Sequence, residues 1–107
     1  MASRLDLHNE FIDLLGTKDE KPTRVYFQPP PSVLMKYDAI RYKLTGKSVR
    51  RANNKAYNIV NEYEGVIITR DPDTSLPDML LARFEMCSVG RPYVSEGLYH
   101  YPFTLYY

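Results

Sequence analysis

The run Tyr-Asn-Ile-Val-Asn-Glu-Tyr-Glu-Gly-Val-Ile-Ile-Thr-Arg, residues 57–70, is the longest strand candidate in the chain and decides the fold class. β-Branched and aromatic residues dominate it, and both residue types favour strands. Alternation places Tyr63 and Ile67 on one face and Val66 on the other, and neither face is apolar throughout. Gly65 interrupts the run, which predicts a bulge or the close approach of another backbone.

Two shorter strands are expected before this run. Residues 24–28 (Arg-Val-Tyr-Phe-Gln) favour a strand, and the prolines at 29–31 end it because proline cannot donate to a ladder. Residues 39–44 alternate apolar side chains with Arg41 and Lys43, which predicts a strand with one wet, basic face.

The segment 45–55 breaks this alternation. Gly46, Ser48, Asn53 and Asn54 are residue types that favour turns. We therefore expect a hairpin loop or a longer excursion between the two strands.

An amphipathic helix is expected over residues 3–15. Ser3 is a suitable N-cap, and Gly16 can end the helix in the left-handed conformation. One helical stripe carries the apolar set Leu5, His8, Ile12 and Leu15, with Phe11 and Leu14 beside it.

The C-terminal part of the chain predicts one more helix and two more strands. Ser75 opens a short helix over 75–84, followed by a short strand over 86–94 that is interrupted by glycine and proline. Residues 98–107 close the chain as a strand, in which Pro102 predicts an edge position or a bulge.

These elements together predict one α+β domain over residues 1–107, in the order αβββαββ. The expected architecture is a two-layer sandwich of two helices and one mainly antiparallel sheet of about five strands. A chain of 107 residues is long enough for one hydrophobic core.

The composition is that of a globular protein, with 44% apolar and 25% charged residues and a net charge of +1. Such a charge supplies no global attraction to nucleic acid or to an anionic membrane. No stretch approaches the length of a membrane-spanning helix, so we expect no membrane partner. The ten tyrosines suit half-buried strands and protein interfaces.

The residues that could carry chemistry are few. His8 lies on the helix stripe, His100 lies in a strand where a cross-strand hydrogen bond is the common outcome, and Cys87 follows Met86 in apolar surroundings. Asp71, Asp73 and Asp78 surround a proline-rich turn and lack the glycine and glutamate of a calcium loop. The five glycines form no phosphate-binding motif. We expect no enzyme, no catalytic residue, no metal and no cofactor.

The charge distribution has one anomaly, in residues 36–55, where seven basic residues accompany only Asp38. Such a segment could bind the phosphates of a nucleic acid, and neighbouring tyrosines could stack on its bases. A solvated face or an acidic protein partner explains the same charges.

A resemblance covers nearly the whole chain, from about residue 5 to residue 107. Its motifs are Leu14-Leu15-Gly16, Val25-Tyr26-Phe27-Gln28-Pro29-Pro30, Ile40-x-Tyr42, Asn53-Asn54 before Tyr57, Tyr63, Asp71-Pro72-Asp73, Pro77-Asp78, Cys87, Arg91-x-Tyr93, Leu98-x-His100 and Phe103-Thr104-Leu105-Tyr106-Tyr107. In this order and spacing they resemble the tail terminator proteins of long-tailed bacteriophages, some of which are called minor tail or tail completion proteins. The chain departs from the family in lacking a Tyr-Pro at 37–39 and in its more basic segment 36–55.

The resemblance implies a structural virion protein that assembles as a hexameric ring on the last ring of tail-tube protein. Such a ring stops tube polymerisation and joins the tail to the head connector, with no enzymatic activity. The expected location is the head-tail interface of the virion, after assembly in the host cytoplasm. The expected contacts with the tube, or with DNA in the lumen, are Lys47, Arg50, Arg51, Asn54 and Lys55, and subunit packing is assigned to Tyr93, Tyr99 and Tyr106.

Two other classes of protein stay open on the sequence. A head-completion or other connector protein would share the ring symmetry but bind on the portal side. A small nucleic-acid-binding protein would bind DNA as a monomer or dimer and would not bind tube protein.

Overall fold

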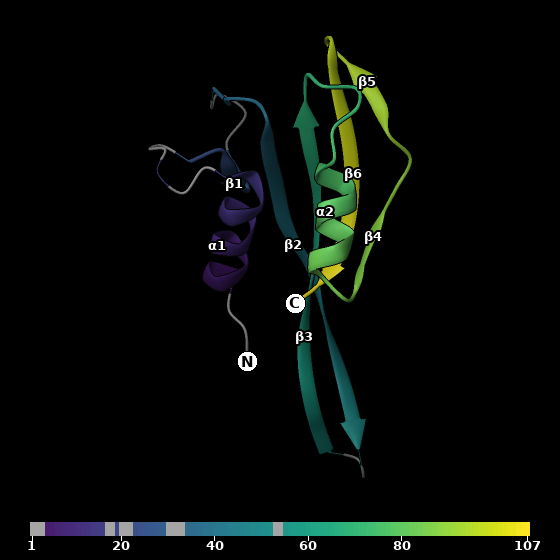
Figure 1. The fold of residues 1–107 in the computed structure, drawn as a ribbon. Helices are drawn as coiled ribbons and strands as arrows, with labels where there is room; N and C mark the ends of the chain where they lie inside the picture. The colour runs from purple at the N-terminus through teal and green to yellow at the C-terminus, as the bar shows by residue number, and fades with distance from the viewer. Residues whose placement is uncertain (1–3, 17–18, 20–22, 30–33, 53–54) are drawn as a thin grey trace.

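The computed structural model describes residues 4–16, 19, 23–29, 34–52 and 55–107, without the side chains of residues 48–52 and 55–59. Its elements are α1 (Arg4–Leu15), β1 (Val25–Phe27), β2 (Ala39–Ala52), β3 (Lys55–Thr69), α2 (Leu76–Arg83), β4 (Cys87–Val89), β5 (Tyr93–Ser95) and β6 (Leu98–Tyr106) (Figure 1). The molecule is elongated, with extents of 51, 29 and 25 Å.

The described strands form one six-stranded sheet in the order β1-β2-β3-β6-β4, and β5 also pairs with β6. Only β1 and β2 are parallel, and every other pair is antiparallel. The predicted α+β class with two helices and a mainly antiparallel sheet is confirmed. The predicted order was wrong by one strand, because the segment 86–94 forms β4 and β5 with a break at residues 90–92.

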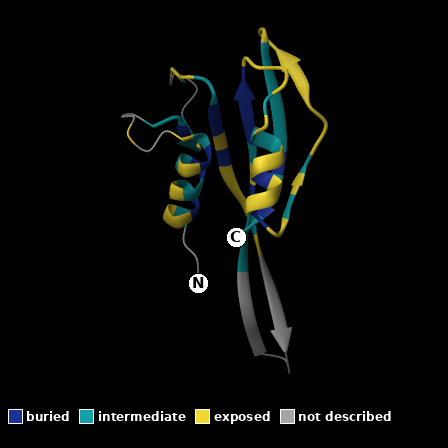
Figure 2. Cartoon of the chain, viewed as in Figure 1, coloured by how far each residue is buried: buried dark blue, intermediate teal, exposed yellow. Residues whose placement is uncertain are grey.

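The core lies between the helices and one face of the sheet, here called the inner face. Cross-strand pairing puts Tyr42, Gly65 and Phe103 side by side on this face. Phe11 of α1 packs on them, with ring centroids 5.0 Å from Tyr42 and 5.7 Å from Phe103. Leu80 of α2 is fully buried in the same cluster. Figure 2 shows the buried residues gathered where the helices meet the strands.

The buried stripe of α1 differs from the predicted one. Leu7, Phe11 and Leu14 are buried, whereas Leu5 is 59% exposed. Apolar residues cover much of this helix, so helical periodicity permits two overlapping stripes. The large Phe11 ring contacts three aromatic rings of the core, and this contact fixes the rotation of the helix. Gly16 ends α1 with a φ of 69°, as its position predicts.

Gly65 is required by the close approach of its neighbours. A Cβ atom at this position would lie 2.5 Å from Cζ of Phe103 and 2.8 Å from the carbonyl oxygen of Arg41. The absence of a side chain lets the Phe103 ring lie directly on β3. The predicted close approach is therefore correct, and the register shows no bulge at this position.

Pro102 does not mark an edge strand or a bulge, so that prediction was wrong. β6 pairs with β3 on one side and with β4 and β5 on the other. The Pro102 carbonyl accepts a hydrogen bond from the Gly90 amide at 2.8 Å, so the proline nitrogen faces the same side. On that side of β6, β4 ends before β5 begins. The backbone N–H that proline lacks therefore falls at the interruption between these two strands.

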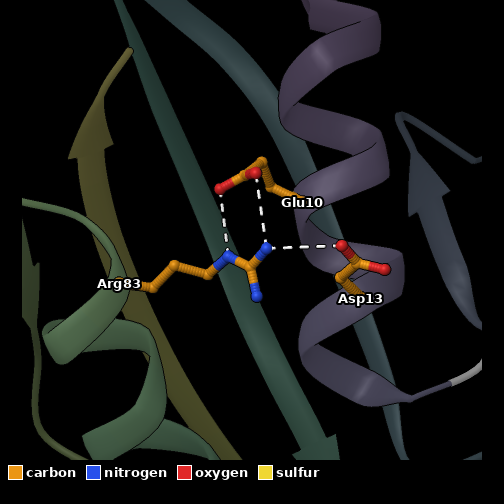
Figure 3. Close-up of polar contacts among 3 residues, drawn as sticks. All are labelled: Glu10, Asp13 and Arg83. Carbon is orange, nitrogen blue, oxygen red and sulfur yellow. Dashed lines mark hydrogen bonds and ion pairs between the residues drawn. The ribbon is translucent and has the colours of Figure 1, made fainter.

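A surface ion pair joins the two helices. The Arg83 guanidinium donates to Glu10 at 3.0 and 3.3 Å and to Asp13 at 3.4 Å (Figure 3). The hydrogen bond with Glu10 raises the pKa of Arg83, and the negative charges of both carboxylates add to this. This bridge links the exposed surfaces of α1 and α2 over the sheet.

Candidate functional site

Half of β2 and half of β3 project from the rest of the molecule as a two-stranded arm, defined here as residues 45–52 and 55–61 (Figure 1). β1 pairs with β2 only at residues 40–42, and β6 pairs with β3 only from Glu62 to Thr69. Beyond those points the strands of the arm pair with each other, and Asn61 at the base of the arm also exchanges two backbone hydrogen bonds with Tyr107. The rest of the described chain is called the body.

The predicted loop over 45–55 was wrong, because β2 continues to Ala52 and β3 begins at Lys55. Of the turn-forming residues that suggested a loop, Gly46 adjoins an irregularity in pairing, Ser48 pairs regularly with Val60, and Asn53 and Asn54 lie outside the described residues. Register shifts occur between Leu44 and Gly46 and between Arg50 and Arg51. A β-bulge admits such residues without ending the strand.

The described basic residues at the base of the arm lie on one face of the sheet. Arg41 pairs with Val66 and Lys43 with Glu64, on the face opposite the helices, here called the outer face. Farther along the arm, Arg50 pairs with Asn58 and Arg51 with Ala56. Arg41 and Lys43 therefore share one side of the sheet.

The remaining predicted arm residues lie elsewhere. Lys47 is exposed and pairs with Asn61, on the inner-face side. The backbone of Lys55 pairs with Ala52 near the tip of the arm. Asn54 lies outside the described residues. The described residues of the predicted contact set thus lie along one arm, and Lys47 is the one whose side chain the structure describes.

The outer face of the body carries a hollow of about 860 Å³ beside the basic positions. Its lining includes Arg41, Lys43, Glu64, Val66 and Pro102. Arg41 and Lys43 are exposed, and neither side chain makes an ion pair or hydrogen bond with another described residue. The alternation of residues 39–44 predicts this basic face. The residues that we expected to contact the tube or DNA, however, began only at Lys47.

The three tyrosines assigned to subunit packing do not form one patch. Tyr93 is 49% exposed on β5 and stacks on His100 with centroids 4.7 Å apart. Tyr99 is half-buried on β6 opposite Val94. Tyr106 lies at the other end of β6, opposite Glu62, whose negative charge raises the pKa of the Tyr106 phenol.

A polar network that the sequence did not predict links α1 to β2. The Tyr42 hydroxyl lies 2.7 Å from Nδ1 of His8 and 3.4 Å from a guanidinium nitrogen of Arg4. Arg4 can only donate, so the Tyr42 oxygen accepts from it and its hydrogen is free to bond to His8. Burial and the nearby Arg4 charge lower the pKa of His8. The sequence signal that could have revealed this network was a histidine on the predicted helix together with a tyrosine on a predicted strand.

The other candidate residues have structural environments. His100 contacts the Leu98 carbonyl of its own strand at 3.0 Å, so the expected cross-strand hydrogen bond is replaced by the cross-strand ring stack with Tyr93. Burial raises the pKa of the Cys87 thiol. Asp71 accepts a hydrogen bond from the Asp73 amide at 2.9 Å, which is the expected turn. Within the described ranges, no three His, Cys, Asp or Glu side chains are grouped as metal ligands.

Comparison with known proteins finds no family model, curated protein or solved structure that matches the chain. In the part of the chain that the structure describes, neither helix has the length and apolar character needed to cross a membrane.

Proposed function

We propose that this protein is a ring-forming tail terminator of a long-tailed bacteriophage. In this role it caps the tail tube, stops tube polymerisation and joins the tail to the head connector. The observation that carries the proposal is the ordered series of motifs that resembles this family from about residue 5 to the C-terminus. A hexamer at the head-tail interface of the virion is the assembly that this resemblance implies.

The edge of the sheet supports a self-associating role. All three residues of β5 are exposed, and Val94 is 62% exposed. An exposed edge strand with apolar side chains is a ready template for pairing with another chain. Head-to-tail contacts of this kind close into rings when the rotation between subunits permits.

The proposal is tested by light-scattering mass measurements on the purified protein, alone and after mixing with the tail-tube protein of the same phage. We expect a six-fold mass, together with tubes of limited length in electron micrographs. A protein that stays monomeric and leaves tube growth unchanged contradicts the proposal. A ring that binds a portal-side protein and ignores the tube identifies a head-completion protein instead.

A variant of β5 adds a structural test of the ring. Val94→Lys places a charge on the exposed edge, where it should weaken pairing between subunits without disturbing the buried core. Leu34→Lys is the matched control, because Leu34 is 94% exposed in a segment outside the sheet. Only the Val94 variant should lower the measured mass.

A further inference from the structure

We propose that the hollow on the outer face is the docking site for a second copy of this chain, which enters it with the acidic turn Asp71-Pro72-Asp73. The inference rests on the proposed function, because it supplies a contact between subunits of the ring, but self-association can be measured without the tail tube. It is carried by the unpaired cations of the hollow, by the shape of its floor and by the free carboxylate of the turn.

The floor of the hollow consists of paired residues that cross the sheet in two rows on its outer face. Each row begins with a cation on β2 and continues over shorter side chains of β3 and β6. The rows are Arg41, Val66 and Pro102, and Lys43, Glu64 and Thr104. Larger groups stand on β6 to either side, namely the stack of Tyr93 on His100 in one direction and Tyr106 in the other. The floor is therefore low between higher walls, and a protruding turn can enter it.

Arg41 is the anchor of the hollow. Its side chain is exposed and makes no ion pair or hydrogen bond with another described residue. Its partner across the strands is the apolar Val66, whereas Lys43 lies directly opposite Glu64. A guanidinium beside an apolar floor can bind a carboxylate through two parallel hydrogen bonds. With Glu64 in the same floor, the hollow suits a single carboxylate better than a continuous phosphate backbone.

The turn after β3 offers such a carboxylate. Asp71, Pro72 and Asp73 are exposed, and the Asp73 side chain has no hydrogen bond or ion pair with another described residue. The turn is held in place by its own hydrogen bonds. The Asp73 amide donates to the Asp71 carboxylate at 2.9 Å, and the Asp71 amide donates to the Thr69 hydroxyl at 3.1 Å. A segment that is ordered before it docks loses less conformational entropy on binding.

Other carboxylates of the described chain are engaged within it. Glu10 and Asp13 bind Arg83, and Asp38 accepts a hydrogen bond from the Thr69 hydroxyl at 2.6 Å. The turn lies at the end of β3 opposite the arm (Figure 1), whereas the hollow lies on the outer face of the body. A contact between two different surfaces of the same chain is heterologous, and its repetition closes a ring when the rotation permits.

A charge swap tests the contact, with the mass of the full-length protein measured by light scattering at low salt and over a range of concentrations. Arg41→Glu and Asp73→Arg should each weaken self-association by about tenfold or more, because each places like charges against each other. An equimolar mixture of the two variants should regain the mass of the unmodified protein. In the mixture, the glutamate of one variant meets the arginine of the other, and the remaining contacts pair the original residues.

Matched controls carry the same charge changes elsewhere. Lys36→Glu and Glu85→Arg change exposed residues outside the hollow and the turn, and they should leave the mass unchanged. Urea unfolding should show all four variants folded, because none of these positions lies in the core.

The inference is overturned if the unmodified protein does not self-associate, if the mixture stays dissociated, or if the controls lower the mass equally. It is also overturned if Arg41→Glu abolishes binding to the tube protein or to a short DNA duplex while self-association persists. A ring that caps tubes but does not depend on Arg41 and Asp73 defeats this inference and leaves the proposed function standing. An assembly that depends on both residues but does not cap tubes does the reverse.

Discussion

The body and the arm share the strands β2 and β3 but are held together by different interactions. In the body, Tyr42 and Ile67 are buried under two helices. In the arm beyond Asn61, the same two strands pair with each other and with no other described strand. A two-stranded hairpin by itself is marginally stable in water. The fold is therefore determined in the body, and the arm is available to meet another molecule.

The largest effect is expected from removing the aromatic centre of the body. Phe11→Ala should lower the free energy of unfolding by about 3–5 kcal/mol, because a fully buried ring in contact with three others leaves a cavity. Denaturant unfolding measures the change. The arm pair Arg50→Gln with Arg51→Gln should stay within about 0.5 kcal/mol of the unmodified protein. Equal losses would contradict the separation of body and arm.

The next largest difference between body and arm is expected from two glycines, one in each shared strand. Gly65→Ala should cost about 1–3 kcal/mol, because the added methyl group meets the Phe103 ring and the Arg41 carbonyl. Gly46→Ala is the matched control in β2, since no atom lies within 4 Å of its added Cβ. It should change the free energy of unfolding by less than about 0.5 kcal/mol. A larger loss at Gly46 would show that the arm is packed against something in the chain.

The network of Arg4, His8 and Tyr42 makes the stability of the body depend on pH. Folding lowers the pKa of His8 below its ordinary value of 6.5, so the unfolded chain binds a proton more readily. The stabilising contribution is complete above about pH 6.5 and is lost as the pH falls through the folded pKa. Urea unfolding across this range should show the decline in the unmodified protein.

His8→Gln should flatten this pH dependence, because glutamine offers an acceptor to Tyr42 but does not titrate. His100→Gln is the control, since His100 lies on β6 and has no contact with the network. An unchanged decline in the His8 variant would place the titrating group elsewhere.

The smallest effect is expected at the helix surface. Arg83→Gln should lower the free energy of unfolding by only about 0.2–1 kcal/mol, because exposed ion pairs contribute little. Its difference from the unmodified protein should shrink in high salt, where charges are screened. A salt-independent loss would mean that the aliphatic part of Arg83 matters more than its charge.

Several features of the body could be predicted from local sequence. Gly16 ends α1, the prolines at 29–31 follow β1, and Gly65 lies where two neighbours come close. Each depends on what one residue type can or cannot do, so a single sequence carries the information. The basic face of residues 39–44 was likewise readable from alternation.

The sequence by itself determined the α+β class, the positions of most elements and the concentration of positive charge between residues 36 and 55. Tertiary structure alone decided three further features. The Phe11 contacts selected the buried stripe of α1, the gap between β4 and β5 allowed Pro102 into a central strand, and continued pairing of β2 with β3 through two bulges turned an expected loop into an arm. All three depend on contacts between residues distant in sequence, and local propensity and periodicity do not encode such contacts.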